Sequence, residues 1–279
     1  MEKRSFDSSG RKLPVIGQGT WQIQTSGRRA AVVALQRGIE LGMTHIDTAE
    51  MYEGAETIVG EAITGRRDEV YVVSKVLPQN ASRRGTITAC EQSLTRLGIE
   101  KLDCYLLHWR GRHPLQETIA AFDELKRQGK ILSWGVSNFD VSDLDEVVAI
   151  AGEAQLAYNQ VLYHLHERAI EHAVLPWCAK HRVALVGYTP FGRGSLARPE
   201  SPEGRTLDAI AAAHGATARQ VVLAFLVRQA PLFTIPKAGR LEHTIENAGA
   251  GQLRLTEDEL ARIDRAFPLG LRPRELPTA

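Results

Sequence analysis

The stretch VYVVSKVLPQNASRRGTITACEQSLTRLGIEKLDCYLLHW, residues 70–109, holds one complete unit of strand, helix and strand. Its two ends, VYVVSKV and LDCYLLHW, are short apolar runs typical of buried strands. Between them Ile87, Cys90, Leu94 and Leu97 recur at helical spacing, and Gly98 follows where a helix would end. We therefore predict two strands joined by a helix.

The same alternation continues along the whole chain. Thr217 with Gln220, and Thr256 with Glu259, have the spacing of capping boxes that open late helices. Eight strands that alternate with helices predict one (β/α)8 barrel domain over residues 1–279. The opening MEKRSFDSSGRKLP predicts a β-hairpin with a Ser-Ser-Gly turn, closing the barrel floor. The eight apolar runs are LPVIGQGTW (13–21), THIDTA (44–49), VYVVSKV (70–76), LDCYLLHW (102–109), ILSWGVSNF (131–139), LAYNQVLY (156–163), VALVGYTP (183–190) and LFTIPK (232–237).

Composition narrows the possible partners. The 279 residues are 43% hydrophobic, enough for a large core, and 34 basic against 33 acidic residues give a net charge of +1. Such a balance provides no field for nucleic acid or an anionic membrane. No apolar run suits a signal peptide or a membrane span, and Cys90, Cys104 and Cys178 are too scattered for a disulfide framework. We expect a cytoplasmic monomer with reduced, buried thiols.

Four polar residues stand where apolar runs end. Asp47 stands where the apolar part of THIDTA ends, and Tyr52 follows in the next loop. Lys75 and His108 stand at the ends of the third and fourth runs. Active sites of such barrels lie at the carboxyl ends of the strands, and these strands would be neighbours. We therefore expect the four side chains to converge. The alternative is that they merely cap their strands.

This set of groups suits proton transfer to a carbonyl oxygen. A tyrosine hydroxyl, with an ordinary pKa near 10, is a weak acid at neutral pH, and a nearby Lys75 ammonium is expected to lower the pKa of Tyr52. Asp47 would hold Lys75 and cancel part of that effect. His108 could donate a hydrogen bond to the substrate oxygen. The four groups supply no hydride, so a cofactor must.

Three motif matches fail. Tyr71 and Lys75 form Tyr-x-x-x-Lys, the pair that short-chain dehydrogenases carry on a helix, but here a strand separates them by about 13 Å. The glycines of GQGTW stop short of the dinucleotide-binding G-x-G-x-x-G pattern. His164 and His166 resemble a metal-binding pair, yet no convincing carboxylate accompanies them, and we interpret them as loop histidines and expect no metal.

Together the motifs resemble the aldo-keto reductase family over nearly the whole chain. The matching segments, in family order, are GQGTW, HIDTAEMY, VSKV, YLLHW, WGVSNF, NQVLYH, GYTPFG and IPKAGRLEHTIEN. The overall pattern is most similar to small bacterial members that reduce methylglyoxal and related aldehydes. The resemblance implies Tyr52 as general acid, Lys75 and Asp47 as its tuning pair, and His108 as the group that orients the carbonyl.

The resemblance also implies NADPH across the barrel top. Ser137, Asn138 and Gln160 would bind the carboxamide, Tyr188 would stack on the nicotinamide, and TPFGRGS would flank the pyrophosphate. Trp21 and Trp109 would form an aromatic wall for the substrate, beside Tyr52 and His108. The full set implied for the cofactor is Gly19, Thr20, Trp21, Asp47, Ser137, Asn138, Gln160, Tyr188, Thr189, Pro190, Phe191, Gly192, Ile235, Lys237, Ala238, Gly239, Arg240, His243, Glu246 and Asn247.

The adenosine end departs from the family pattern. Lys237 is the lysine expected near the 2′-phosphate, but Ala238 stands where a serine is usual and His243 where an arginine is usual. An arginine forks onto phosphate with a fixed charge, which a neutral imidazole lacks. Arg240 could take over part of that contact. We expect NADPH to be preferred modestly, with NADH accepted.

Short segments follow the fourth strand and the last helix, and they predict a shallow, open site for small carbonyls. We expect an NADPH-dependent reductase of small aldehydes or ketones such as methylglyoxal. Two alternatives stay open: a diketo-sugar-acid reductase of the same family, and a redox-sensing subunit that holds NADPH without turnover, as the same fold does on potassium channels.

Overall fold

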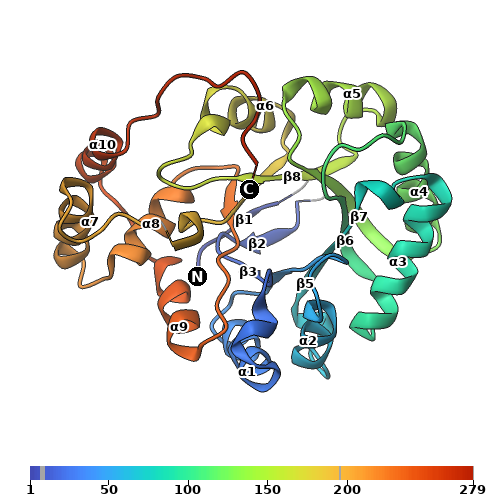
Figure 1. Ribbon diagram of the computed structural model, residues 1–279, viewed down its shortest axis with the longest axis horizontal. Helices are drawn as coiled ribbons and strands as arrows, with labels where there is room; N and C mark the ends of the chain where they lie inside the picture. The colour runs from blue at the N-terminus through green and yellow to red at the C-terminus, as the bar shows by residue number, and fades with distance from the viewer. Residues whose placement is uncertain (7–9, 195, 279) are drawn as a thin grey trace.

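The computed structural model describes residues 1–6, 10–194 and 196–278, and its centre is a sheet curled into a barrel (Figure 1). Among these residues the sheet has eight strands, and all neighbouring strands run parallel, in the order in which they occur along the chain. The predicted (β/α)8 architecture is confirmed. The strands are β3 (Gln18–Gly19), β4 (His45–Asp47), β5 (Tyr71–Val76), β6 (Leu102–Leu107), β7 (Ile131–Ser137), β8 (Leu156–Leu162), β9 (Ala184–Tyr188) and β10 (Leu232–Thr234).

Isolated bridges join the first and last strands. Ile16 pairs with Thr234 and Gly19 with Lys237, both in parallel. A glycine is required at position 19, because a Cβ there would lie 2.5 Å from the Ile235 carbonyl oxygen. The predicted strand 13–21 is therefore wrong in extent: its first residues belong to a hairpin, and only Gln18–Gly19 forms a barrel strand.

A ring of amphipathic helices surrounds the barrel (Figure 1). Both predicted capping boxes are present, with Thr217 and Thr256 each accepting a hydrogen bond from the backbone N–H three residues on. Gly98, at φ 65°, ends the helix of the strand–helix–strand unit as predicted. The helices are α1 (Arg28–Glu40), α2 (Ala55–Ala62), α3 (Arg83–Leu97), α4 (Leu115–Arg127), α5 (Val141–Ala151), α6 (Val174–His181), α7 (Pro202–Ala213), α8 (Ala218–Leu226), α9 (Leu241–Ala250) and α10 (Glu257–Ala266).

A hairpin closes the amino-terminal end of the barrel. Strand β1 (Lys3–Ser5) pairs antiparallel with β2 (Lys12–Pro14), as predicted, while Ser8 and Ser9 of the expected turn lie outside the described residues. Phe6 inserts among aromatic rings of four barrel strands, with centroid distances of 5.0 to 5.5 Å. The barrel interior is therefore a packed core at this end, and any ligand must enter at the other end.

The three cysteines are buried, as predicted, and none of them forms a disulfide with another described residue. No single described helix is long and apolar enough to cross a membrane; α7 and α8 would meet that test only as a pair, and they are bent by 93°. After α10 the chain runs back past α6 toward the middle of the barrel (Figure 1).

Candidate active site

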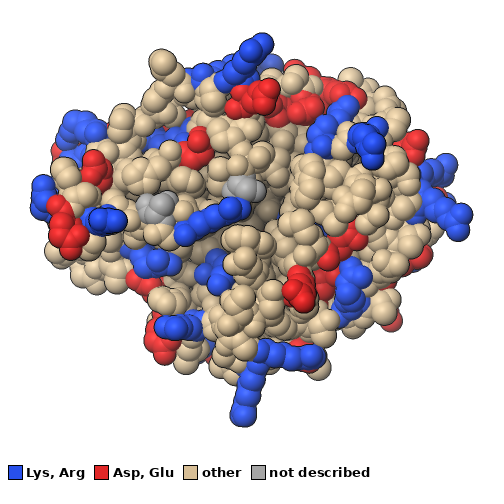
Figure 2. Space-filling view, viewed as in Figure 1, with Lys and Arg blue, Asp and Glu red and all other residues tan. Residues whose placement is uncertain are grey.

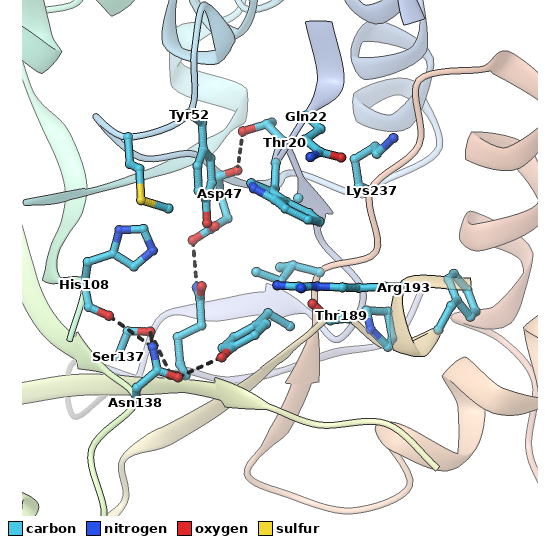
Figure 3. A pocket seen from close by; sticks show the side chains of 18 of the residues that line it. Thr20, Gln22, Asp47, Tyr52, His108, Ser137, Asn138, Thr189, Arg193 and Lys237 are labelled. Atoms are coloured by element: carbon cyan, nitrogen blue, oxygen red, sulfur yellow. Dashed lines mark hydrogen bonds between the residues drawn. The ribbon is translucent and has the colours of Figure 1, made fainter. Parts of the chain in front are cut away.

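A cavity of about 580 Å³ opens at the carboxyl ends of the strands. Side chains converge on it from the segments that follow nearly every strand (Figure 3), and Figure 2 shows it as a hollow in the middle of one face. Predicted site residues that line it are Gly19, Thr20, Trp21, Asp47, Tyr52, His108, Trp109, Ser137, Asn138, Gln160, Tyr188, Thr189, Pro190, Phe191, Ile235 and Lys237.

A buried ion pair lies behind the cavity wall, which its Asp47 member reaches. Lys75 Nζ donates to Asp47 Oδ1 at 2.6 Å and to the Thr48 carbonyl oxygen at 2.9 Å, and both charged side chains are almost fully buried. Gln160 Nε2 donates to the second Asp47 oxygen, Oδ2, at 2.8 Å. Strands β4, β5 and β8 thus fix the carboxylate and ammonium from three sides. Both charges are paired, as burial requires.

Tyr52 connects this ion pair to the cavity. Lys75 Nζ lies 3.5 Å from the Tyr52 hydroxyl oxygen, which it contacts as a hydrogen-bond donor, and 4.9 Å from the ring centroid. Burial raises the pKa of Tyr52 and Lys75 opposes that rise, while Asp47 adds to it. The net direction is upward, so the predicted fall in the pKa of Tyr52 is wrong. The physical role of Lys75 is to limit a rise caused by desolvation.

The same ion pair keeps Lys75 charged. Burial alone would lower the pKa of Lys75, but Asp47 and Tyr52 outweigh it, and the pKa is raised. For Asp47, burial exceeds the stabilisation from Lys75 and Gln160, so the pKa of its carboxyl is raised. The cation beside the Tyr52 hydroxyl is therefore present throughout the neutral range.

His108 faces Tyr52 across the cavity (Figure 3). The two ring centroids are 5.7 Å apart at an interplanar angle of 75°. Burial, with a smaller contribution from Lys75, lowers the pKa of His108 to about 2, so its imidazole is neutral. Its Nδ1 is buried with no hydrogen-bond partner among the described residues. A neutral imidazole can donate one hydrogen bond to a ligand oxygen.

A chain of amides and hydroxyls lies beside the ion pair. Tyr188 OH donates to Asn138 Oδ1 at 2.8 Å, and Asn138 Nδ2 donates to the His108 carbonyl oxygen at 3.1 Å. Ser137 Oγ donates to the Gln160 carbonyl oxygen at 2.9 Å. Asn138 has φ of 63°, a left-handed conformation that asparagine tolerates better than most residues. These contacts tie the ends of β7, β8 and β9 to the loop after β6.

Cations mark the opposite side of the cavity. Lys237 follows β10, Arg193 follows β9 and Arg219 lies in the first turn of α8, and all three line the cavity. Figure 2 shows Lys and Arg side chains at the edge of the hollow. The acidic side chain of the wall, Asp47, is already paired with Lys75. The charge of this side therefore favours an anionic ligand.

Some predicted residues stand outside the cavity wall. Glu246 of α9 accepts a hydrogen bond from Thr217 Oγ1 at 2.8 Å and lies 3.6 Å from His243 Nδ1. Asn247 is buried, and its Oδ1 has no hydrogen-bond partner among the described residues. The full set outside the wall is Lys75, Gly192, Ala238, Gly239, Arg240, His243, Glu246 and Asn247.

Sequence reasoning missed several wall residues. Gln22, Met51 and Arg219 line the cavity without having been predicted. Arg193 and Gly194 also line it, and they belong to the TPFGRGS segment that was expected to flank the pyrophosphate; its last residue, Ser195, lies outside the described residues. Arg219 had no signal of its own, because only the packing of α8 against α9 brings it to the cavity.

Trp21, Met51 and Trp109 form a half-exposed apolar rim near Tyr52 and His108. No described residue of the chain beyond α10 lines the cavity.

His164 and His166 lie outside the wall; His164 is half-buried, while His166 is exposed and packs edge-on against Phe267. No cluster of three metal-ligating side chains occurs among the described residues.

Comparison with known proteins places the chain among reductases. The model of the Aldo/keto reductase family matches residues 15–267. A methylglyoxal reductase of Escherichia coli is 45% identical over 273 residues, with 96% of each chain covered. A glyoxal reductase of Bacillus subtilis is 31% identical over 258 residues, covering 92% of this chain and 90% of its own.

Solved structures agree with this placement. An aldo-keto reductase of Klebsiella pneumoniae in complex with NADPH superposes with a TM-score of 0.93 at 42% identity, with 100% of both chains covered. A putative 2,5-diketo-D-gluconic acid reductase B superposes with a TM-score of 0.85 at 29% identity, covering 100% of this chain and 96% of its own.

Proposed function

The chain belongs to the aldo/keto reductase family and is an NAD(P)H-dependent oxidoreductase, and from this we propose that it reduces small aldehydes and ketones, methylglyoxal among them, to alcohols. The observation that carries the proposal is the contact of the Tyr52 hydroxyl with Lys75 Nζ, on a cavity that His108 also lines. Two of the activities named for relatives, reduction of methylglyoxal and of glyoxal, fit the small apolar rim.

NADPH is the cofactor, and the cavity residues fit it. The cationic side formed by Arg193, Arg219 and Lys237 suits a ligand with several phosphates. The buried, unpartnered Asn247 Oδ1 suits the amino group of an adenine, an acceptor for a donor. Ser137, Asn138 and Gln160 would hold the carboxamide and Tyr188 the nicotinamide ring, and Lys237 would meet a phosphate. When bound, NADPH supplies the hydride.

We propose that Tyr52 gives its hydroxyl proton to the carbonyl oxygen of the substrate. The neutral His108 donates a hydrogen bond to the same oxygen and orients the carbonyl toward the cofactor. Lys75, held by Asp47, stabilises the phenolate that remains after transfer. Trp21 and Trp109 would contact the apolar part of the substrate.

Substrate profiling tests this proposal. Purified protein with NADPH is expected to reduce methylglyoxal and aromatic aldehydes at measurable rates, followed by loss of NADPH absorbance. A rate confined to diketo-sugar acids would favour the sugar-acid reductase, to which a solved structure of that name gives some support. Tight NADPH binding without any turnover would contradict the proposal.

The neutral state of His108 leads to a prediction about the pH dependence of kcat/KM. Because the pKa of His108 is lowered to about 2, the imidazole stays neutral as pH falls from 8 to 5, and kcat/KM is expected to show no acid limb in that range. A histidine with an ordinary pKa near 6.5 would instead become charged below that pH. The measurement is kcat/KM for methylglyoxal from pH 5 to 9 at saturating NADPH. An acid limb near pH 6.5 that vanishes in His108→Asn would contradict the neutral state.

A further prediction concerns the choice of cofactor. We expect NADPH to be preferred over NADH by a modest margin, because Lys237 and other cations line the cavity while His243 stands outside its wall. We expect NADH to support turnover with a higher Michaelis constant, about tenfold to a hundredfold above that of NADPH, the worth of one charge-assisted contact. Steady-state kinetics with both cofactors and one aldehyde measures it, and equal constants would contradict it.

A further inference from the structure

Arg219 occupies a distinctive position at the cationic side of the cavity. Its guanidinium carbon lies 3.7 Å from the ring centroid of Phe191, which follows β9 and also lines the cavity. The stacked pair joins the first turn of α8 to the loop after β9. A guanidinium carbon this close to the face of an aromatic ring makes a cation–π contact, which positions the cation and leaves its N–H groups able to bind a phosphate or carboxylate.

The guanidinium is only partly satisfied within the chain. Arg219 Nε lies 3.4 Å from Glu246 Oε2, is buried, and makes no hydrogen bond to another described residue. Burial lowers the pKa of Arg219 and Glu246 opposes that effect, while 33% of the side chain remains exposed, so the group is partly desolvated. Glu246 also accepts a hydrogen bond from Thr217 and lies beside His243, so Arg219 shares this carboxylate with two other side chains. A desolvated charge with spare donors is a site for an anion.

His243 is the competing residue, and its surroundings differ. His243 and Glu246 both lie on α9, three residues apart. The His243 side chain is 47% exposed, against 33% for Arg219, and it does not line the cavity. Of the two basic side chains beside Glu246, only Arg219 therefore lines the cavity.

We propose that Arg219, rather than His243, recognises the 2′-phosphate of NADPH and sets the preference for NADPH over NADH. The inference rests on the proposed function. Its guanidinium would take over the bidentate contact for which position 243 lacks an arginine. Glu246 lies 3.4 Å from the same guanidinium and competes for it, so we expect the preference for NADPH to be modest.

Equilibrium binding of NADP⁺ and NAD⁺, followed by quenching of tryptophan fluorescence, tests the assignment. In Arg219→Gln we expect the Kd for NADP⁺ to rise about tenfold to a hundredfold, with that for NAD⁺ changed by less than about threefold. In Arg219→Gln, binding of adenosine 2′,5′-bisphosphate should weaken in parallel with that of NADP⁺, whereas binding of AMP should not. Arg219→Lys keeps the charge but not the bidentate geometry of the guanidinium, so its Kd for NADP⁺ should lie between those of the unaltered protein and of Arg219→Gln.

Two matched controls accompany these variants. His243→Ala removes the second basic side chain beside Glu246, and Arg84→Gln removes an exposed charge from α3, away from the cavity. Both should leave the ratio of the Kd for NADP⁺ to that for NAD⁺ within about threefold of its value in the unaltered protein. The assignment is overturned if Arg219→Gln weakens both cofactors equally, if it changes neither, or if His243→Ala alone removes discrimination. Failure of the unaltered protein to bind either cofactor would instead sink the proposed function. Circular dichroism of each variant verifies folding.

Discussion

Lys75→Met is expected to lose most carbonyl reductase activity, at least about a hundredfold in kcat, because the remaining Tyr52 is a weaker acid. Lys75 is the cation that opposes the rise in the pKa of Tyr52, so its removal raises that pKa further. An acid of higher pKa gives up its proton less readily. Activity that requires protonated Tyr52 is lost as pH rises through the pKa, and the alkaline limb of the rate profile should therefore move to higher pH.

Folding must be separated from catalysis in this test. Lys75→Met leaves Asp47 buried without its counter-ion, a change that costs about 3 to 5 kcal/mol of stability when one partner of a buried pair is removed. The double variant Asp47→Asn, Lys75→Met removes both charges and provides a folded comparison. If folded Lys75→Met kept full activity with an unshifted alkaline limb, Lys75 would be a structural residue.

Tyr52→Phe is expected to lower kcat for methylglyoxal by at least about a hundredfold, the usual contribution of a positioned general acid. The phenyl ring can keep its edge contact with His108, so the Kd for NADPH should change little. Tyr105→Phe is the matched control, since it removes a buried hydroxyl from a ring that packs against Phe122 of α4, on the outer side of the barrel wall. Steady-state kinetics and cofactor titration of both variants measure the difference. A similar loss in Tyr105→Phe would indicate a general effect of disturbed packing.

Much of the fold could be predicted because strand and helix periods are local properties of the sequence. The positions of Asp47, Lys75 and His108 at the ends of β4, β5 and β6 follow from the ends of apolar runs, and parallel neighbours then place them together. Barrel closure could not be predicted in detail. Strand β3 has only Gln18 and Gly19, and its pairing with the end of the chain is a contact across more than two hundred residues.

Electrostatic properties were predicted less well than positions. The sequence places a lysine near Tyr52 but contains no measure of how deeply the pair is buried, and burial decides the sign of the pKa shift. Arg219 was missed for a related reason: neither its capped helix nor its neighbours mark it, and only the contact with Phe191 and Glu246 reveals its place. Depth and tertiary neighbours are therefore what sequence patterns leave undetermined.

Single-turnover oxidation of NADPH tests the role of Tyr52 as proton donor most directly, because it isolates the chemical step from product release. Protein saturated with NADPH is mixed rapidly with methylglyoxal, and the loss of NADPH absorbance is followed for the unaltered protein and for Tyr52→Phe, each in H₂O and D₂O. We predict a transient slower in D₂O for the unaltered protein, and a transient at least about a hundredfold slower in Tyr52→Phe. Equal transients in the two proteins would contradict the assignment of Tyr52.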